Sequence, residues 1–282
     1  MYFSLSNNNN NIRLFQMASK AIPKNTNLKP IVSFGLITDI HYANHDDRWN
    51  YSKTFLRRYR NSLKLVNQAC DYWLNSPQPI SFVLQLGDLI DGLCETNKTS
   101  QEDLQTILKQ FEQFPRIYHL WGNHELYNFH RNDLLNSPLC SFNIENISPA
   151  HYGTIEVCSN LRIVALDTYE LSLLGVQKDS EAYRQALDEF RRNNSNEKVN
   201  EWTGLEGFNK RFTQLNGGLT EKQLHWLDEQ LTQARIDHAN VVVIGKYSPR
   251  QKRLFSSSSA NLERKKKVLN QVHSYKQTSL FT

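Results

Sequence analysis

The sequence predicts an α/β protein built around a parallel sheet. Three short apolar runs, at residues 32–38, 80–86 and 116–120, have the length and composition of buried strands. Two segments between them, around 55–73 and 104–111, repeat apolar residues at helical spacing. The order strand, helix, strand, helix, strand is typical of parallel strands joined by right-handed crossovers. A chain of 282 residues is long enough to bury a sizeable core in one or two domains.

Local signals place the elements of the second half of the chain. Residues 151–157 and 161–166 are apolar runs on either side of Ser159-Asn160 and predict a hairpin, and a helix is expected at 179–192. Thr220 to Gln223 has the pattern of a capping box and opens a further helix. The buried face of that helix is expected to consist of Leu224, Leu227, Leu231 and Ala234. Residues 241–244 predict the last strand.

Charge is distributed unevenly along the chain, whose formal net charge is +5. Residues 245–282 carry nine cations and one acid, and residues 1–38 carry four cations and no acid, which leaves −7 for residues 39–244. An acidic body suits a protein that gathers carboxylates around cations and argues against specific nucleic-acid binding. We therefore expect a disordered segment at 1–29, a folded domain at 30–244 and a basic, low-complexity tail at 245–282.

The composition also indicates the cellular compartment of the protein. The four cysteines are scattered without a Cys-x-x-Cys pair, which disfavours a disulfide scaffold and favours a reducing compartment such as the cytoplasm. The N-terminal segment lacks acids and carries Arg13 and Lys20, so organellar targeting is an alternative. No apolar run reaches the roughly 18 residues of a membrane span, so we expect no membrane partner. The sequence does not indicate an oligomeric state.

Potential metal ligands follow each strand of the first half. Asp39 and His41 come where the first strand ends, Asp88 ends the second strand, and Asn123 follows the third. Because parallel strands share one carboxyl edge, we expect these four side chains to meet there. Carboxylate, amide and imidazole donors suit manganese, iron or zinc. Each motif alone favours an ordinary turn or a chance match, whereas all three in order favour a two-metal site that acts on a phosphoryl group.

The same segments carry a family resemblance. Asp39-Ile40-His41, Gly87-Asp88-Leu89-Ile90-Asp91 and Gly122-Asn123-His124-Glu125 resemble the motifs of the calcineurin-like metallophosphoesterase family. Matches at 34–43, 57–59, 84–92, 166–169 and 212–227 resemble its branch of manganese-dependent ADP-ribose/CDP-alcohol diphosphatases. The resemblance covers about residues 30–244. It implies an α/β fold with a metallophosphoesterase β-sandwich flanked by helices. It also implies a hydrolase that cuts the phosphoanhydride bond of a small nucleotide, a nucleoside diphosphate linked to a sugar or an alcohol.

The resemblance further implies two divalent ions, manganese by preference, with iron or zinc as alternatives. Asp39 and His41 would hold one ion, Asp88 would bridge both, and Asn123 would hold the second.

Two kinds of supporting residue are expected around these ligands. His124 would stabilise the charged transition state or protonate the leaving oxygen. Asp91 would orient a ligand or the loop that carries it. In the loop after the first motif, Trp49 or Tyr51 would stack on a base, or both would instead anchor the next helix.

The chain departs from the family pattern after its last predicted strand. The resemblance leads us to expect a histidine just after this strand and two more in a Gly-His-x-His segment. Gly245-Lys246 follows the strand instead, and the sequence contains no Gly-His-x-His. We therefore expect the fold to be incomplete at its C-terminal end, with weak metal binding and little or no turnover. The alternative function is a catalytically impaired relative that serves as a nucleotide- or protein-binding module.

Overall fold

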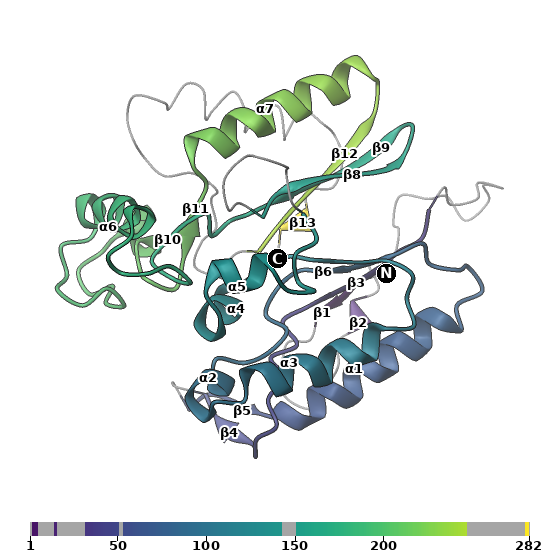
Figure 1. The fold of residues 1–282 in the computed structure, drawn as a ribbon, viewed down its shortest axis with the longest axis horizontal. Coiled ribbons are helices and arrows are strands. Elements are labelled where there is room, and N and C mark those ends of the chain that lie inside the picture. Colours follow the sequence, from purple (N-terminus) through teal and green to yellow (C-terminus); the bar gives the residue numbers. More distant parts are fainter. Residues whose placement is uncertain are drawn as a thin grey trace. The chain divides into compact units, whose positions relative to one another are not determined.

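The computed structural model describes residues 2–4, 14–15, 32–50, 53–142, 151–246 and 280–281 (Figure 1). The chain divides into two compact units, Met1–His119 and Leu120–Thr282, and each has a sheet of its own. Most of the segments 1–29 and 245–282 lies outside the described residues, so their expected disorder and low complexity stay predictions.

The first unit is built on a five-stranded sheet with the order β2-β1-β3-β6-β7. Its strands are β1 (Tyr2–Ser4), β2 (Leu14–Phe15), β3 (Gly35–Thr38), β6 (Val83–Gln85) and β7 (Ile117–His119). β3 runs parallel to β1 and β6, and β6 runs parallel to β7, whereas β1 and β2 are antiparallel. The three strands predicted for this half are confirmed as parallel neighbours, and each occupies only part of its apolar run.

Three helices connect the strands of this sheet. They are α1 (Tyr59–Leu74), α2 (Leu93–Asn97) and α3 (Ser100–Leu108), and α3 continues into the 3-10 turn η1 (Lys109–Phe111). Figure 1 shows α1 and α3 along the same side of the sheet. Trp73 of α1 packs directly over β3, because a Cβ on Gly35 would come within 2.9 Å of its indole ring. Glycine at this strand position therefore lets the helix approach the sheet.

The helix predicted from residue 55 begins later than its periodicity indicates. β5 (Leu56–Arg57) pairs antiparallel with β4 (Arg48–Trp49), and α1 starts after this short ribbon. The Asn50 side-chain oxygen accepts hydrogen bonds from the backbone N–H groups of Thr54 and Phe55, at 2.7 and 3.2 Å. This side-chain turn holds Thr54 and Phe55 in a loop before the helix.

The second unit contains a four-stranded mixed sheet with the order β13-β12-β9-β8. Its strands are β8 (Gly153–Cys158), β9 (Leu161–Leu166), β12 (Asn240–Gly245) and β13 (Leu280–Phe281). β8 and β9 form the predicted hairpin, and β12 lies parallel to β9 over its whole length. The carboxyl ends of β9 and β12 therefore lie next to each other.

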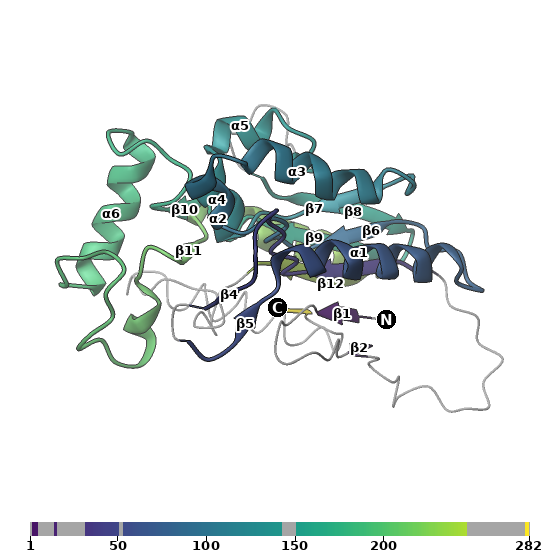
Figure 2. The ribbon, with the colours of Figure 1, turned by 90° about the horizontal axis from the view of Figure 1, so that it is seen from below.

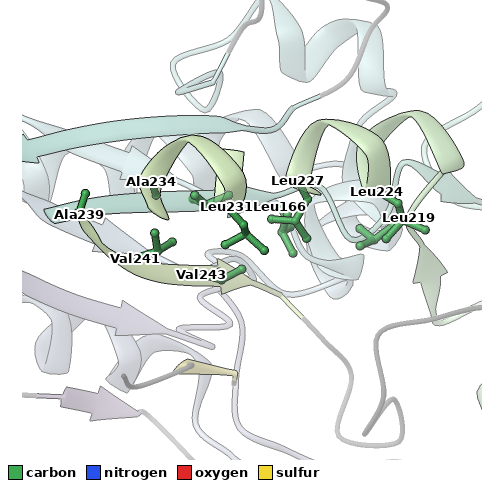
Figure 3. Close-up of a cluster of buried hydrophobic side chains, with 10 residues drawn as sticks. Leu166, Leu219, Leu224, Leu227, Leu231, Ala234, Ala239, Val241 and Val243 are labelled. Carbon is green, nitrogen blue, oxygen red and sulfur yellow. The ribbon is translucent and has the colours of Figure 1, made fainter. Parts of the chain in front are cut away.

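Helix α7 (Glu221–Ile236) covers this sheet and buries its predicted face (Figure 3). The cluster consists of Val164, Leu166, Leu219, Leu224, Leu227, Leu231, Ala234, Ala239, Val241 and Val243. Thr220 caps the helix, because its hydroxyl oxygen accepts a hydrogen bond from the Gln223 N–H at 3.2 Å. In a complete capping box the Gln223 side chain would also bond to the Thr220 N–H. Here the Gln223 side chain bonds to Asp167 and Glu170 instead.

The other elements of the second unit surround the end of its sheet. They are α4 (Asn123–Asn128), α5 (Arg131–Leu135), β10 (Leu171–Ser172), α6 (Glu181–Asn193), the 3-10 turn η2 (Gly207–Arg211) and β11 (Gly217–Gly218). β10 pairs with β11, and Figure 2 shows α6 beside them. α6 confirms the helix predicted at 179–192. Within the described part of the chain, we find no helix with the length and apolar character of a membrane span.

Candidate functional site

In the first unit, the segments after β3 and β6 stay paired beyond the ends of these strands. The Asp39 N–H donates to the Gly87 carbonyl at 3.2 Å, and the His41 N–H donates to the Asp88 carbonyl at 3.0 Å. Both segments are thus held in a fixed register at the carboxyl edge of the sheet. The structure brings Asp39, His41 and Asp88 together there, at the edge where α/β sheets gather ligands.

The backbone at these positions is strained. Asp39, His41 and Asp88 have φ angles of 56°, 49° and 58°, in the left-handed region that side chains with a Cβ avoid. Each such residue costs roughly 1–2 kcal/mol relative to the right-handed region. Strain of this kind persists where the surrounding structure enforces it, and it concentrates at functional sites.

The imidazole of His41 lies among three carboxylates. Its Nε2 atom is 3.5 Å from Asp39 Oδ1 and 3.9 Å from Asp88 Oδ2, and its Nδ1 atom is 3.5 Å from Asp91 Oδ2. Asp88 and Asp91 are buried, whereas the Asp39 side chain is about a third exposed. The cluster therefore concentrates negative charge around one nitrogen heterocycle at the edge of the sheet.

Asp91 is itself held from two sides. Arg57 Nη1 donates to Asp91 Oδ2 at 2.9 Å, and the Leu93 N–H donates to Asp91 Oδ1 at 3.0 Å. An Nδ1–H directed at Asp91 leaves Nε2 of His41 as the ligand atom, on the side of Asp39 and Asp88. Sequence reasoning placed Arg57 within the resemblance, at 57–59, but did not assign it a role.

The carboxylates of this cluster change the pKa of His41. Burial alone lowers the pKa of this imidazole, but the close contacts with Asp39 and Asp91 and the charge of Asp88 outweigh burial and raise the pKa to about 10. In the absence of another cation, a proton on His41 compensates the surrounding carboxylates.

The donor set fits a divalent cation. Two ligand atoms bound to one ion at about 2.0–2.2 Å lie roughly 3–4 Å apart. The Nε2 separations of 3.5 and 3.9 Å fall in that range. Imidazole together with carboxylates is also the donor combination that suits manganese, iron and zinc.

The second unit carries the third motif at the start of α4. Gly122 has an extended backbone, and its N–H donates to Glu125 Oε2 at 2.7 Å, which satisfies one donor at the helix start. Asn123 and His124 occupy the first turn and are half-buried. The His124 ring packs edge-to-face on Tyr127, with 5.2 Å between ring centroids. This arrangement fixes the helix start that carries both predicted residues.

Asn123 is oriented from the end of β9. The Tyr169 hydroxyl lies 3.4 Å from Asn123 Oδ1 and 3.3 Å from the Leu215 carbonyl, and it donates toward both. The segment of Tyr169 is fixed by Asp167, which contacts Arg131 in a buried ion pair and accepts a hydrogen bond from the Tyr169 N–H at 3.1 Å. Sequence reasoning placed 166–169 within the resemblance but gave these residues no role.

Aromatic contacts secure the same corner of the second unit. Trp121 stacks on His151 with 3.9 Å between ring centroids and 6° between planes. Arg131 lies over the Trp121 ring at 5.3 Å. The Ser141 N–H donates to His151 Nε2 at 3.0 Å, which assigns the proton of the neutral ring to Nδ1. Trp121 and His151 are thus structural supports beside Asn123.

Other predicted positions have clear outcomes. Lys246, which follows β12, is buried with 3% exposure, and its carbonyl accepts a hydrogen bond from Thr168 Oγ1. Trp49 is 61% exposed on the β4–β5 ribbon, so it does not anchor α1 in the core, and its contact with a base stays a prediction. Tyr51 lies outside the described residues, and so does most of the predicted tail.

Comparison with known proteins identifies similar chains. The model of the "Calcineurin-like phosphoesterase" family matches residues 32–268. A manganese-dependent ADP-ribose/CDP-alcohol diphosphatase from Xenopus tropicalis is 37% identical over 77% of this chain and 67% of its own length. The protein of the same name from Mus musculus is 34% identical over 81% of this chain and 70% of its own length. The chain therefore spans about two thirds of the length of these curated relatives.

A solved structure supports the fold. A dimetal phosphatase from Danio rerio matches with a TM-score of 0.77 and 30% identity, over 87% of this chain and 78% of the other. The metallophosphoesterase fold expected from the three motifs is confirmed by this match. The comparisons do not favour the alternative of a binding module without catalysis.

Proposed function

We propose, since the chain belongs to the calcineurin-like phosphoesterase family, that it hydrolyses the phosphoanhydride bond of nucleoside diphosphates linked to a sugar or an alcohol. ADP-ribose and CDP-alcohols are the substrates in the names of its relatives. The observation that carries the proposal is the convergence of Asp39, His41 and Asp88 at the carboxyl ends of β3 and β6.

The residues of the chain divide the work of this reaction. Asp39, His41 and Asp88 would hold divalent cations, manganese by preference, and Asn123 would contribute its amide oxygen. Such ions, when bound, supply a nucleophilic hydroxide and neutralise charge on the phosphoryl oxygens. Asp91 keeps the His41 ring in place through Nδ1. His124 would stabilise the charge that develops on the phosphate or give a proton to the leaving oxygen.

The overall reaction adds one water to the diphosphate. The bond between one phosphorus and the bridging oxygen breaks, and each half of the substrate leaves as a phosphate monoester. For ADP-ribose the products are AMP and ribose 5-phosphate. A small nucleotide is thus the proposed partner of the chain. We also propose a reducing compartment such as the cytoplasm, which agrees with the four free cysteines.

The test is whether the purified full chain releases AMP from ADP-ribose in the presence of manganese, with AMP measured by chromatography. Because the C-terminal histidines of the family pattern are absent, we expect low turnover that needs Mn²⁺ and falls to background in the double variant D39A D88A. Asp71→Ala, at an exposed position of α1, is the matched control and should keep wild-type turnover.

Two outcomes would count against the proposal. Equal AMP release by wild type and D39A D88A would show that the carboxylates are not involved. Binding of ADP-ribose without any turnover would instead support the alternative of an impaired, nucleotide-binding relative.

A further inference from the structure

A polar pocket in the second unit has no assigned role. It has a volume of about 330 Å³ and lies between the start of α5, the start of α6 and the cap of α7. Its lining includes Arg131, Glu170, Gly175, Gln177, Gln185 and Thr220. Pockets for drug-sized ligands span about 300–1,000 Å³, so this one suits a single small group rather than a whole nucleotide.

Glu170 is the central charged group of the pocket. Its Oε2 atom accepts hydrogen bonds from the Thr220 hydroxyl at 2.7 Å, the Gln223 amide at 2.7 Å and the Thr220 N–H at 3.3 Å. Its Oε1 atom makes no hydrogen bond to any described residue. The three donors therefore fix the carboxylate and leave one oxygen for an occupant of the pocket.

The charges of the pocket disfavour a phosphate as that occupant. Arg131 is the only lysine or arginine among the described lining residues, and it contacts Asp167 in an ion pair and donates to the Tyr169 carbonyl at 3.1 Å. Glu170 has no ion pair among the described residues. A phosphate placed here would meet a carboxylate without a cation to offset it.

The lining also disfavours a base. Bases bind by stacking on aromatic rings, and the described lining contains the imidazole of His130 but no phenylalanine, tyrosine or tryptophan. Instead it offers the side-chain amides of Asn132, Gln177 and Gln185, each of which can donate and accept hydrogen bonds. Amides around a fixed carboxylate suit a ligand with several hydroxyl groups.

Within the second unit, hydrogen bonds connect the pocket lining to Asn123, the metal ligand predicted in this unit. Arg131 of the pocket wall donates to the carbonyl of Tyr169, and the Tyr169 hydroxyl donates to Oδ1 of Asn123 at 3.4 Å. Two hydrogen bonds thus connect the pocket lining to a predicted metal ligand. Arg131, Tyr169 and Asn123 therefore form one connected series between the pocket lining and the start of α4.

We propose that this pocket binds the sugar of the diphosphate-linked substrate, with Glu170 Oε1 accepting hydrogen bonds from neighbouring hydroxyls. This inference rests on the proposed function, because it assigns the sugar-binding part of that reaction. A carboxylate that binds a ribose diol is a known solution in nucleotide-binding proteins. The residues of the pocket position the substrate and take no part in bond cleavage.

The decisive variant is Glu170→Gln. A glutamine keeps one oxygen as acceptor for Thr220 and Gln223, and its amide NH₂ group, which cannot accept a hydrogen bond, replaces only the oxygen available to the pocket. Glu229→Gln, at an exposed position of α7, is the matched control. Ala182→Leu, at the pocket rim on α6, is a second variant that fills space without touching Glu170.

Calorimetry on the manganese-loaded full chain would compare ribose 5-phosphate with inorganic phosphate. Loss of a hydrogen bond to a charged group corresponds to about 10- to 100-fold in affinity. We expect E170Q and A182L to weaken ribose 5-phosphate binding by that factor and to leave phosphate binding unchanged. In kinetics, KM for ADP-ribose should rise with little change in kcat, while bis(4-nitrophenyl) phosphate, which has no sugar, should be cleaved at the wild-type rate.

The outcomes separate this inference from the proposed function. If wild type cleaves ADP-ribose and E170Q matches it in KM and in ribose 5-phosphate affinity, the pocket assignment is wrong and the hydrolase remains. If ribose 5-phosphate binding depends on Glu170 but ADP-ribose is not cleaved, the pocket stands and the proposed reaction is wrong. If ribose 5-phosphate binds no more tightly than phosphate, the pocket assignment is overturned.

Discussion

At the scale of single residues, Asp91 decides how well His41 can serve as a ligand. Asp91 Oδ2 lies 3.5 Å from His41 Nδ1 and accepts a hydrogen bond from Arg57 at 2.9 Å. In Asp91→Asn one oxygen still accepts a hydrogen bond from the Leu93 N–H. The amide NH₂ group that replaces Oδ2 is itself a donor, so it repels the N–H groups of Arg57 and His41. We expect Mn²⁺ affinity to fall about 10- to 100-fold, the usual effect of losing a partner of a ligand.

The measurement for D91N is a Mn²⁺ titration followed by electron paramagnetic resonance of the free ion. The control is Asp71→Asn, because this aspartate is exposed on α1. An unchanged dissociation constant in D91N would show that Asp91 does not support His41.

A second residue, His119 in β7, should make the free energy of unfolding depend on pH. Burial lowers the pKa of His119 from 6.5 to about 3. Below pH 6.5 the unfolded chain binds a proton there that the folded chain rejects, so stability is complete above pH 6.5 and is lost as the pH falls toward 3. This one group should lower the free energy of unfolding by about 1.4 kcal/mol per pH unit within that window.

The variant His119→Asn removes this dependence and still offers a donor to Gln85, whose side-chain oxygen lies 3.3 Å from His119 Nδ1. Urea unfolding of both proteins between pH 7 and pH 4 gives the comparison. Carboxylates titrate in both proteins, so the difference between them isolates the histidine. A difference that stays constant over this range would contradict the assignment.

At the scale of elements, Thr220 joins α7 to the segment after β9. Its hydroxyl oxygen caps the helix at the Gln223 N–H, and its proton goes to Glu170 at 2.7 Å. Replacing an N-cap threonine by alanine typically costs about 0.5–2 kcal/mol. We expect T220A to lie at the upper end, because Glu170 also loses a donor. Urea unfolding checks this, and Thr232→Ala, within α7 and remote from the cap, should cost little.

The elements also show how far the sequence predicts this fold and site. Apolar runs and helical periodicity predict β3, β6, β7, α6 and α7, because burial acts on each of them through a regular repeat. The start of α1 was missed because the Asn50 turn is a local hydrogen-bond effect that periodicity does not register. Likewise Gln223 fits a capping box in sequence, but partners from the end of β9 outcompete the local one.

In the candidate site, too, some residues are predictable from the sequence and others are not. Asp39, His41 and Asp88 are predictable because strand ends in a parallel sheet meet at one edge. Arg57 and Glu170 are not, because Arg57 meets Asp91 across 34 positions and Glu170 meets Thr220 across 50. Such tertiary partners have no local pattern, and only the fold reveals them.

At the scale of the whole molecule, a protein that gathers carboxylates at the end of its sheet should be stabilised by the cation it binds. An ion that binds only the folded state adds about 2.7 kcal/mol of stability at a concentration of 100 times its dissociation constant, which corresponds to a rise in Tm of roughly 5–10 °C. We expect Mn²⁺ to raise Tm in this way and EDTA to reverse it, as measured by differential scanning calorimetry. D39A D88A should respond to neither. An equal Mn²⁺ shift in both proteins would place the stabilising ion elsewhere, and no shift in wild type would show that the cluster holds a proton in preference to a metal.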